Sequence, residues 1–131
     1  MSKPFIDSNV ILYLLSADAA KADRAQSLLE AGGVISVQVL NEVASVCTRK
    51  LKMPWDEVDA VLLAAKAACG VVPLTLASHE KSVELAKRFQ LSVYDANIVA
   101  SALIAGSELL FSEDMQSGMT IASLQIRNPF K

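Results

Sequence analysis

Histidine and glycine are scarce in this chain of 131 residues. The single histidine, His79, lies beside Ser78 and Glu80 at an expected helix start, so we expect it on the surface. One histidine excludes hydrolysis by a histidine pair, and no nucleophile motif around it indicates a Ser/His/Asp triad. The five glycines form no phosphate-binding loop. Any chemistry must therefore use other side chains.

Cysteines and long apolar runs are also few. Cys47 and Cys69 lack the spacing of a metal or redox motif and lie in apolar helical surroundings, so we expect buried free thiols. No apolar stretch approaches the ~18 residues of a membrane span. The opening MSKPF carries a lysine but no apolar segment follows it, so we expect no signal peptide. These features predict a cytoplasmic protein.

Hydrophobic residues make up 53% of the chain, which predicts one domain over residues 1–131. Periodicity predicts strands at 3–6, 34–37, 71–74 and 108–111, with a weaker one at 121–126. It predicts helices at 9–15, 19–31, 38–52, 54–68, 78–89 and 92–105, the last two capped by Ser78 and Ser92. We expect helices 38–52 and 54–68 to form a hairpin. Strands separated by helices indicate a three-layer α/β/α fold with a mostly parallel sheet.

Four acids stand where such a fold gathers functional groups. Asp7 and Asp114 follow the first and fourth strands, and carboxyl ends of parallel strands meet at one edge of the sheet. Glu42 and Asp95 lie early in helices that can reach the same edge. Carboxylates about 4 Å apart repel by roughly 4 kcal/mol per pair near a protein surface. The cluster therefore predicts a site for a hard divalent metal ion.

Each acid also has an ordinary structural explanation. Asp7 is a possible helix N-cap, Asp95 forms a possible capping box with Ser92, and Asp114 is a possible turn residue. Glu42 interrupts an apolar helical face, where its alternative is an edge position with a solvated tip. A shared metal site explains all four acids at once.

The net charge of −2 does not indicate tight, non-specific binding to nucleic acid. Without the four acids the rest of the chain carries +2, and bound metal ions add positive charge where a phosphate would lie. The mild acidity is therefore compatible with a nuclease.

The short sequences around the acids, FIDSN, LNEV, VYDANIVA and FSEDM, resemble the acidic motifs of PIN-domain ribonucleases, in particular VapC-type toxins. The resemblance covers nearly the whole chain. It implies a PIN-like fold in which Asp7, Glu42, Asp95 and Asp114 are the family's four acids. Asn9 matches a polar residue often found after the first acid, and Ser112 stands where many members have threonine.

The resemblance also implies an activity and partners. A Mg²⁺- or Mn²⁺-dependent endoribonuclease is expected, usually a homodimer, inhibited by an antitoxin encoded beside it. Asp7, Asp95 and Asp114 would bind metal, and Glu42 would bind metal or orient the attacking water. Asn9 and Ser112 would hold ligands or phosphate by hydrogen bonds.

The RNA and the antitoxin need surfaces of their own. Two basic runs could contact RNA: Arg49, Lys50 and Lys52, and Lys87 with Arg88. Both runs also suit the C-terminal ends of helices, where positive charge is favourable. An antitoxin is expected to place a basic side chain among the acids and to cover apolar surface along residues 38–68.

Two other functions stay open at this stage. An aspartyl-phosphate phosphatase would use an acid after the first strand as nucleophile, but its Asp-x-Asp motif has Asn9 in the third position here. A PIN-like interaction module without catalysis is the second alternative, and the presence of all four acids argues against it.

Overall fold

Short buried strands in parallel pairing organise the molecule. In the computed structural model, which describes residues 2–131, six strands pair in the order β3-β2-β1-β4-β6-β5. The strands are β1 (Phe5–Ile6), β2 (Gly33–Ser36), β3 (Cys69–Val72), β4 (Leu109–Phe111), β5 (Thr120–Ile121) and β6 (Leu124–Arg127). Every neighbouring pair is parallel except β5 and β6. The predicted, mostly parallel sheet is confirmed.

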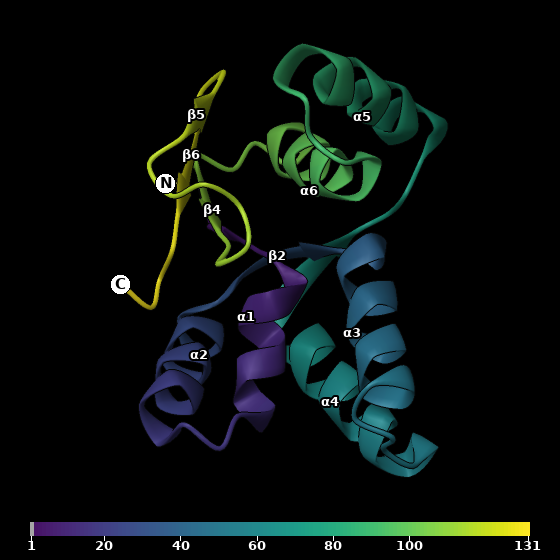
Figure 1. Cartoon of the computed structure of the whole chain (residues 1–131), viewed down its shortest axis with the longest axis vertical. Helices are drawn as coiled ribbons and strands as arrows, with labels where there is room; N and C mark the ends of the chain where they lie inside the picture. The colour runs from purple at the N-terminus through teal and green to yellow at the C-terminus, as the bar shows by residue number, and fades with distance from the viewer. Residues whose placement is uncertain (1) are drawn as a thin grey trace.

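Helices lie on both faces of the sheet. They are α1 (Ser8–Leu12), α2 (Ala19–Ala31), α3 (Val37–Arg49), α4 (Trp55–Ala68), α5 (Leu76–Phe89) and α6 (Val93–Ile104). The chain steps from β1 to β2 to β3 through α1–α4 and returns to β4 through α5 and α6, so right-handed crossovers place these two groups on opposite faces. Figure 1 shows α5 and α6 together and α3 beside α4, as expected for a hairpin. The three-layer α/β/α architecture is confirmed.

The central strand β1 is where the direction of the crossovers changes. It pairs with β2 on one side and with β4 on the other. A Cβ atom on Gly33 would lie 2.9 Å from the carbonyl oxygen of Pro4, so glycine permits the close approach of β2 to β1. In open parallel sheets ligands bind beyond the carboxyl ends of the strands at this position.

Packing against the sheet fixes the rotation of α3. Val39, Val43 and Cys47 recur every four residues and are fully buried, so they form the face of α3 that packs into the core. This leaves Glu42 beside the buried face, half-buried rather than fully exposed. Cys47 and Cys69 are buried free thiols, as predicted.

Several predicted boundaries are wrong by a few residues. The third strand is Cys69–Val72 rather than 71–74, and the predicted helix 9–15 divides into α1 and a 3₁₀ turn, η1 (Tyr13–Leu15). The region 121–126 holds a turn of the β5–β6 hairpin instead of one strand. Among residues 2–131, no helix is long and apolar enough to cross a membrane.

The predicted cap of α5 is also wrong. Thr75 is the N-cap, and Ser78 is the third residue of the helix. Thr75 Oγ1 accepts from the Ser78 N–H at 3.0 Å while Ser78 Oγ accepts from the Thr75 N–H at 2.8 Å, a reciprocal capping box. Ser92 caps α6 as predicted, and His79 is exposed as predicted.

Candidate functional site

Asp7 follows β1 and is almost completely buried, with 3% of its surface exposed. It is the N-cap of α1, and its Oδ1 accepts from the Ser8 N–H at 2.7 Å. The capping alternative is therefore right for one carboxylate oxygen. Because α1 has only five residues, one capping hydrogen bond does little to offset the cost of burying a carboxylate. The second carboxylate oxygen takes no part in this cap and makes other contacts.

The second oxygen of Asp7 accepts hydrogen bonds from a side chain of α1 and from one that follows β4. Ser112 Oγ donates to Oδ2 at 2.8 Å and Asn9 Nδ2 donates at 3.3 Å. Asn9 Oδ1 in turn accepts from the Glu113 N–H at 3.0 Å. These contacts follow from the pairing of β1 with β4, which continues as a bond from the Asp7 N–H to the Phe111 carbonyl at 3.0 Å. Asn9 and Ser112 thus position Asp7.

Glu42 lies in the second turn of α3 and both its oxygens are hydrogen-bonded. Ser8 Oγ donates to Oε1 at 2.7 Å, and Gln38 Nε2 donates to Oε2 at 2.9 Å. Ser8 Oγ is also 3.4 Å from Asp7 Oδ1, so one hydroxyl group links the two acids. Ser8 and Gln38 were missed as site residues. The i, i+4 spacing of Gln38 and Glu42 was a usable signal; Ser8 offered none beyond its place next to Asp7.

Asp95 and Asp114 are more open. Asp95 is half-buried in the first turn of α6, where its N–H donates to Ser92 Oγ at 3.0 Å. Asp114 is exposed in the segment after β4. Burial raises the pKa of Asp95, and the negative charges of Glu42 and Asp114 raise it further against the effect of the Ser92 hydrogen bond.

The same electrostatic coupling reaches Asp7. Burial raises its pKa to about 6, against the hydrogen bonds from Ser112 and Ser8, and the charges of Glu42 and Asp95 add to the increase. Neither of the two ion pairs recorded for residues 2–131 includes any of the four acids. Ser8 thus links Asp7 to Glu42, and the coupling of charges extends from these two acids to Asp95 and from Asp95 to Asp114.

The side chains as they stand do not form a closed cage for an ion. Within the described part of the chain, no group of three or more His, Cys, Asp or Glu side chains is arranged to hold a metal. The donor set nevertheless fits a hard divalent ion, because it consists of carboxylate oxygens whose mutual repulsion a cation relieves. Closing such a site requires movement of the less constrained acids.

A clamp formed by Tyr13, Lys21 and Glu113 holds the segment that carries Asp114. The Tyr13 hydroxyl donates to Glu113 Oε1, and Lys21 Nζ lies 3.6 Å from Glu113 Oε2 and 3.3 Å from the Tyr13 hydroxyl. The Tyr13 ring packs on Phe130 with centroids 4.5 Å apart. This clamp was not predicted, because Glu113 lies 100 residues from Tyr13 in the sequence.

The predicted basic runs lie at the ends of helices. Arg49 is in the last turn of α3, followed by Lys50 and Lys52, and all three are exposed. Lys87 and Arg88 occupy the last turn of α5. All five suit the negative ends of helix dipoles, and Arg49, Lys50 and Lys52 lie at the C-terminal end of the helix that also carries Glu42.

The PIN domain family matches residues 5–116 of this chain. The chain belongs to the PIN domain family. The match includes all four acids, Asn9 and Ser112, and it confirms the family resemblance of the motifs. No curated protein sequence matches the chain.

Solved structures of toxins share this PIN fold. A toxin–antitoxin complex from Klebsiella pneumoniae aligns with a TM-score of 0.73 at 21% identity, covering 96% of this chain and 97% of the other. DNA-bound VapBC from Salmonella typhimurium gives 0.72 at 17% identity, covering 98% and 99%. VapC20 from Mycobacterium tuberculosis, a Sarcin-Ricin loop cleaving toxin, gives 0.64 at 21% identity, covering 84% and 88%. At these identities the likeness concerns the fold.

Proposed function

We propose that this PIN-domain protein is a Mg²⁺- or Mn²⁺-dependent endoribonuclease and the toxin of a VapC-type toxin–antitoxin pair. One observation carries the proposal. Asp7 is buried at the carboxyl end of the central strand, its carboxylate accepts four hydrogen bonds, and its pKa is raised by burial and by the neighbouring acids. A protein tolerates such a carboxylate cluster where a cation binds.

The four acids would have two parts in the proposed reaction. Asp7, Asp95 and Asp114 would hold the ion directly or through water. The bound ion would lower the pKa of a water molecule and stabilise negative charge on the phosphate. Glu42 would hold an ion or orient the attacking water, and its hydrogen bonds from Ser8 and Gln38 keep its carboxylate in place.

In the proposed reaction, a water molecule attacks the phosphorus of one phosphodiester bond in line with the leaving 3′ oxygen. The water oxygen bonds to phosphorus, the bond from phosphorus to the 3′ oxygen breaks, and that oxygen leaves with a proton. The products carry a 5′-phosphate and a 3′-hydroxyl. Asn9 and Ser112 keep the Asp7 carboxylate oriented throughout, which is the role of groups that bind the ligands of a metal.

An antitoxin is the proposed protein partner, and the protein is proposed to act as a homodimer in the cytoplasm. An arginine of the antitoxin would suit the acids, since a guanidinium group bridges carboxylates and competes with metal. Apolar side chains would cover a groove of about 320 Å³ that begins next to Asn9 and runs between η1 and the end of α3. The groove is lined mainly by Leu12, Leu15, Val46 and Leu51. This partner rests on the fold shared with toxin–antitoxin complexes.

The test is cleavage of RNA by the purified protein with Mg²⁺, with Mn²⁺ and with a chelator, followed by sequencing of the fragment ends. We expect metal-dependent internal cuts with 5′-phosphate ends, suppressed by the co-expressed neighbouring gene product. Hydrolysis of a generic phosphomonoester would favour a phosphatase instead. Absence of any metal-dependent cleavage would leave a PIN-like interaction module as the better description.

A further inference from the structure

A cavity of about 450 Å³ opens beside Glu42, between α3 and the first turn of α6. It is lined by Gln38, Asn41, Glu42, Ser45 and Tyr94. We propose that this cavity binds one unstacked nucleobase of single-stranded RNA next to the cleaved phosphodiester bond, and that it sets the sequence preference of cleavage. The inference rests on the proposed ribonuclease function and names a substrate-binding site for it.

Helix geometry gives the cavity its polar wall. Gln38, Asn41 and Ser45 are three and four residues apart, so they lie along one side of α3. Glu42 belongs both to this wall and to the acidic site, and Tyr94 directly precedes Asp95. A base in the cavity would therefore belong to a nucleotide that also presents its phosphate to the acids.

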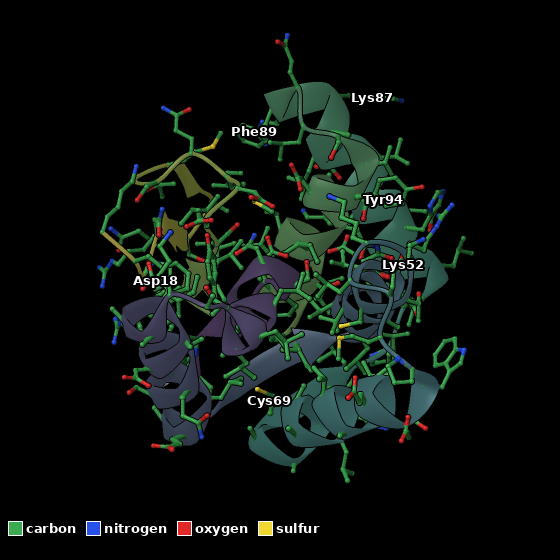
Figure 2. The ribbon with its side chains drawn as sticks, turned by 60° about the horizontal axis from the view of Figure 1, so that its bottom comes forward. Asp18, Lys52, Cys69, Lys87, Phe89 and Tyr94 are labelled. Atoms are coloured by element: carbon green, nitrogen blue, oxygen red, sulfur yellow. The ribbon has the colours of Figure 1, made fainter. Side chains whose placement is uncertain are left out.

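Tyr94 supplies an aromatic surface that the fold does not use. Tyr94 is 67% exposed, and Figure 2 labels it on the side of the molecule where α3 lies. The aromatic pair recorded among residues 2–131 joins Tyr13 and Phe130 and does not include Tyr94. Exposed aromatic rings beside a site for single-stranded nucleic acid stack on its bases, since every base offers a π face.

The polar wall supplies hydrogen-bonding groups suited to the edge of a base. Gln38 Nε2 is committed to Glu42 at 2.9 Å, which leaves its carbonyl oxygen as an acceptor. Within residues 2–131 no side-chain hydrogen bond is recorded for Asn41 or Ser45, and both are exposed. An amide with free donor and acceptor groups distinguishes bases by their Watson–Crick edges.

The ligand class follows from the combination of ring and amides. In an A-form duplex each base is stacked on its neighbours and paired through its edge, so it cannot enter the cavity. An unpaired loop nucleotide can turn its base out, stack it on Tyr94 and present its edge to Asn41. The cavity volume lies in the range of small-ligand sites.

The experiment measures the cleavage of short single-stranded RNAs that differ only in the two nucleotides flanking the cut. The enzymes are wild type, Tyr94→Ala, Tyr94→Phe, Asn41→Ala and the control Trp55→Ala. Trp55 is 64% exposed on α4, so its loss matches that of Tyr94 in exposure but lies outside the cavity. RNA affinity in chelator, measured by fluorescence anisotropy, adds a readout without catalysis.

We expect Tyr94→Ala to weaken RNA affinity and raise KM by about 5-fold to about 150-fold, as for loss of one stacked base. Tyr94→Phe should recover most of that loss. Asn41→Ala should reduce the discrimination between bases at one flanking position by about fivefold or more, with a smaller change for the preferred base.

The outcomes separate the two proposals. If the wild type cleaves RNA but Tyr94→Ala behaves like Trp55→Ala, or if Asn41→Ala keeps the full base preference, the nucleobase cavity is wrong and the nuclease stands. If Tyr94→Phe is as defective as Tyr94→Ala, stacking is not the function of the ring. If the wild type cleaves no RNA under any metal, both proposals fail.

Discussion

The two halves of the acidic region differ in how firmly the fold holds them. Asp7 and Glu42 have every carboxylate oxygen hydrogen-bonded, by Ser8, Asn9, Ser112 and Gln38. Asp95 is half-buried at the start of a helix, and Asp114 is exposed. Asp7 and Glu42 form the fixed half, which lies at the end of β1 and on the core-packed helix α3. Asp95 and Asp114 form the open half, which lies on the first turn of α6 and in a loop.

This difference explains why, within residues 2–131, no group of three or more His, Cys, Asp or Glu side chains is already arranged to hold a metal ion. In the proposed reaction, Asp7 and Glu42 would be the fixed ligands of the cation, and Asp95 and Asp114 would move toward it. The clamp on Glu113 limits that movement, because Glu113 is bonded to Tyr13 and Lys21 next to Asp114. We therefore expect metal binding and closure of the site to occur together.

The largest expected effect is on RNA cleavage, and it is measured by comparing a substitution at Asp7 with one at Asp114. Asp7→Asn keeps the side-chain volume but removes a charge from the fixed half, so we expect RNA cleavage to fall to the level of a blank. Asp114→Asn removes a charge from the open half and should leave measurable cleavage at raised metal concentration. Initial rates against Mn²⁺ concentration give the comparison. Equal loss in both variants would show that the halves do not differ.

A second effect concerns stability in the absence of metal. The pKa of Asp7 is raised from 3.8 to about 6, so the folded state binds its proton more tightly than the unfolded chain does. The free energy of unfolding contributed by Asp7 should therefore be greatest below pH 4 and fall as pH rises through about 6, by roughly 3 kcal/mol in all.

Urea unfolding of wild type and Asp7→Asn across pH 4–8, in chelator, measures this effect. The stability of Asp7→Asn relative to wild type should rise from pH 4 to about pH 6 and stay constant above about pH 7. The comparison of the two chains cancels the titration of the other acids to first order. A difference that does not depend on pH would mean that Asp7 is not held in the environment described.

A smaller effect is expected from Ser112, which is fully buried and donates to Asp7 at 2.8 Å. Ser112→Ala should weaken metal affinity about 10-fold to about 100-fold, the usual cost of losing a group that orients a ligand. Ser112→Thr keeps the hydroxyl and should lose much less. Calorimetric titration with Mn²⁺ checks both; equal affinities for the two variants would remove Ser112 from the site.

The smallest effect is expected at the clamp. Tyr13→Phe removes the hydroxyl bond to Glu113 but keeps the ring that packs on Phe130, so we expect about 1 kcal/mol of lost stability. Hydrogen exchange of residues 112–116 should become faster. Lys81→Met breaks the exposed Lys81–Glu84 pair on α5 and is the matched control. Unchanged exchange in Tyr13→Phe would show that the clamp does not hold the loop.

Periodicity was sufficient to predict the layers of this fold and the approximate place of each acid. The stripe of Val39, Val43 and Cys47 fixes α3, and strand order then brings Asp7 and Ser112 together. Local rules could not place Ser8 or Tyr13, since their roles depend on contacts across 34 and 100 residues. The cap of α5 was misassigned because Thr75 and Ser78 are both good caps and only the structure shows which N–H each one meets.

The most direct test of the account is thermal unfolding of wild type and Asp7→Asn with increasing Mn²⁺. An ion that binds only the folded state stabilises it by about 2.7 kcal/mol at a hundredfold excess over Kd. If the four acids bind the ion, the melting temperature rises with Mn²⁺ in wild type and does not change in Asp7→Asn. A wild-type melting temperature indifferent to millimolar Mn²⁺ and Mg²⁺ would contradict a metal site among Asp7, Glu42, Asp95 and Asp114.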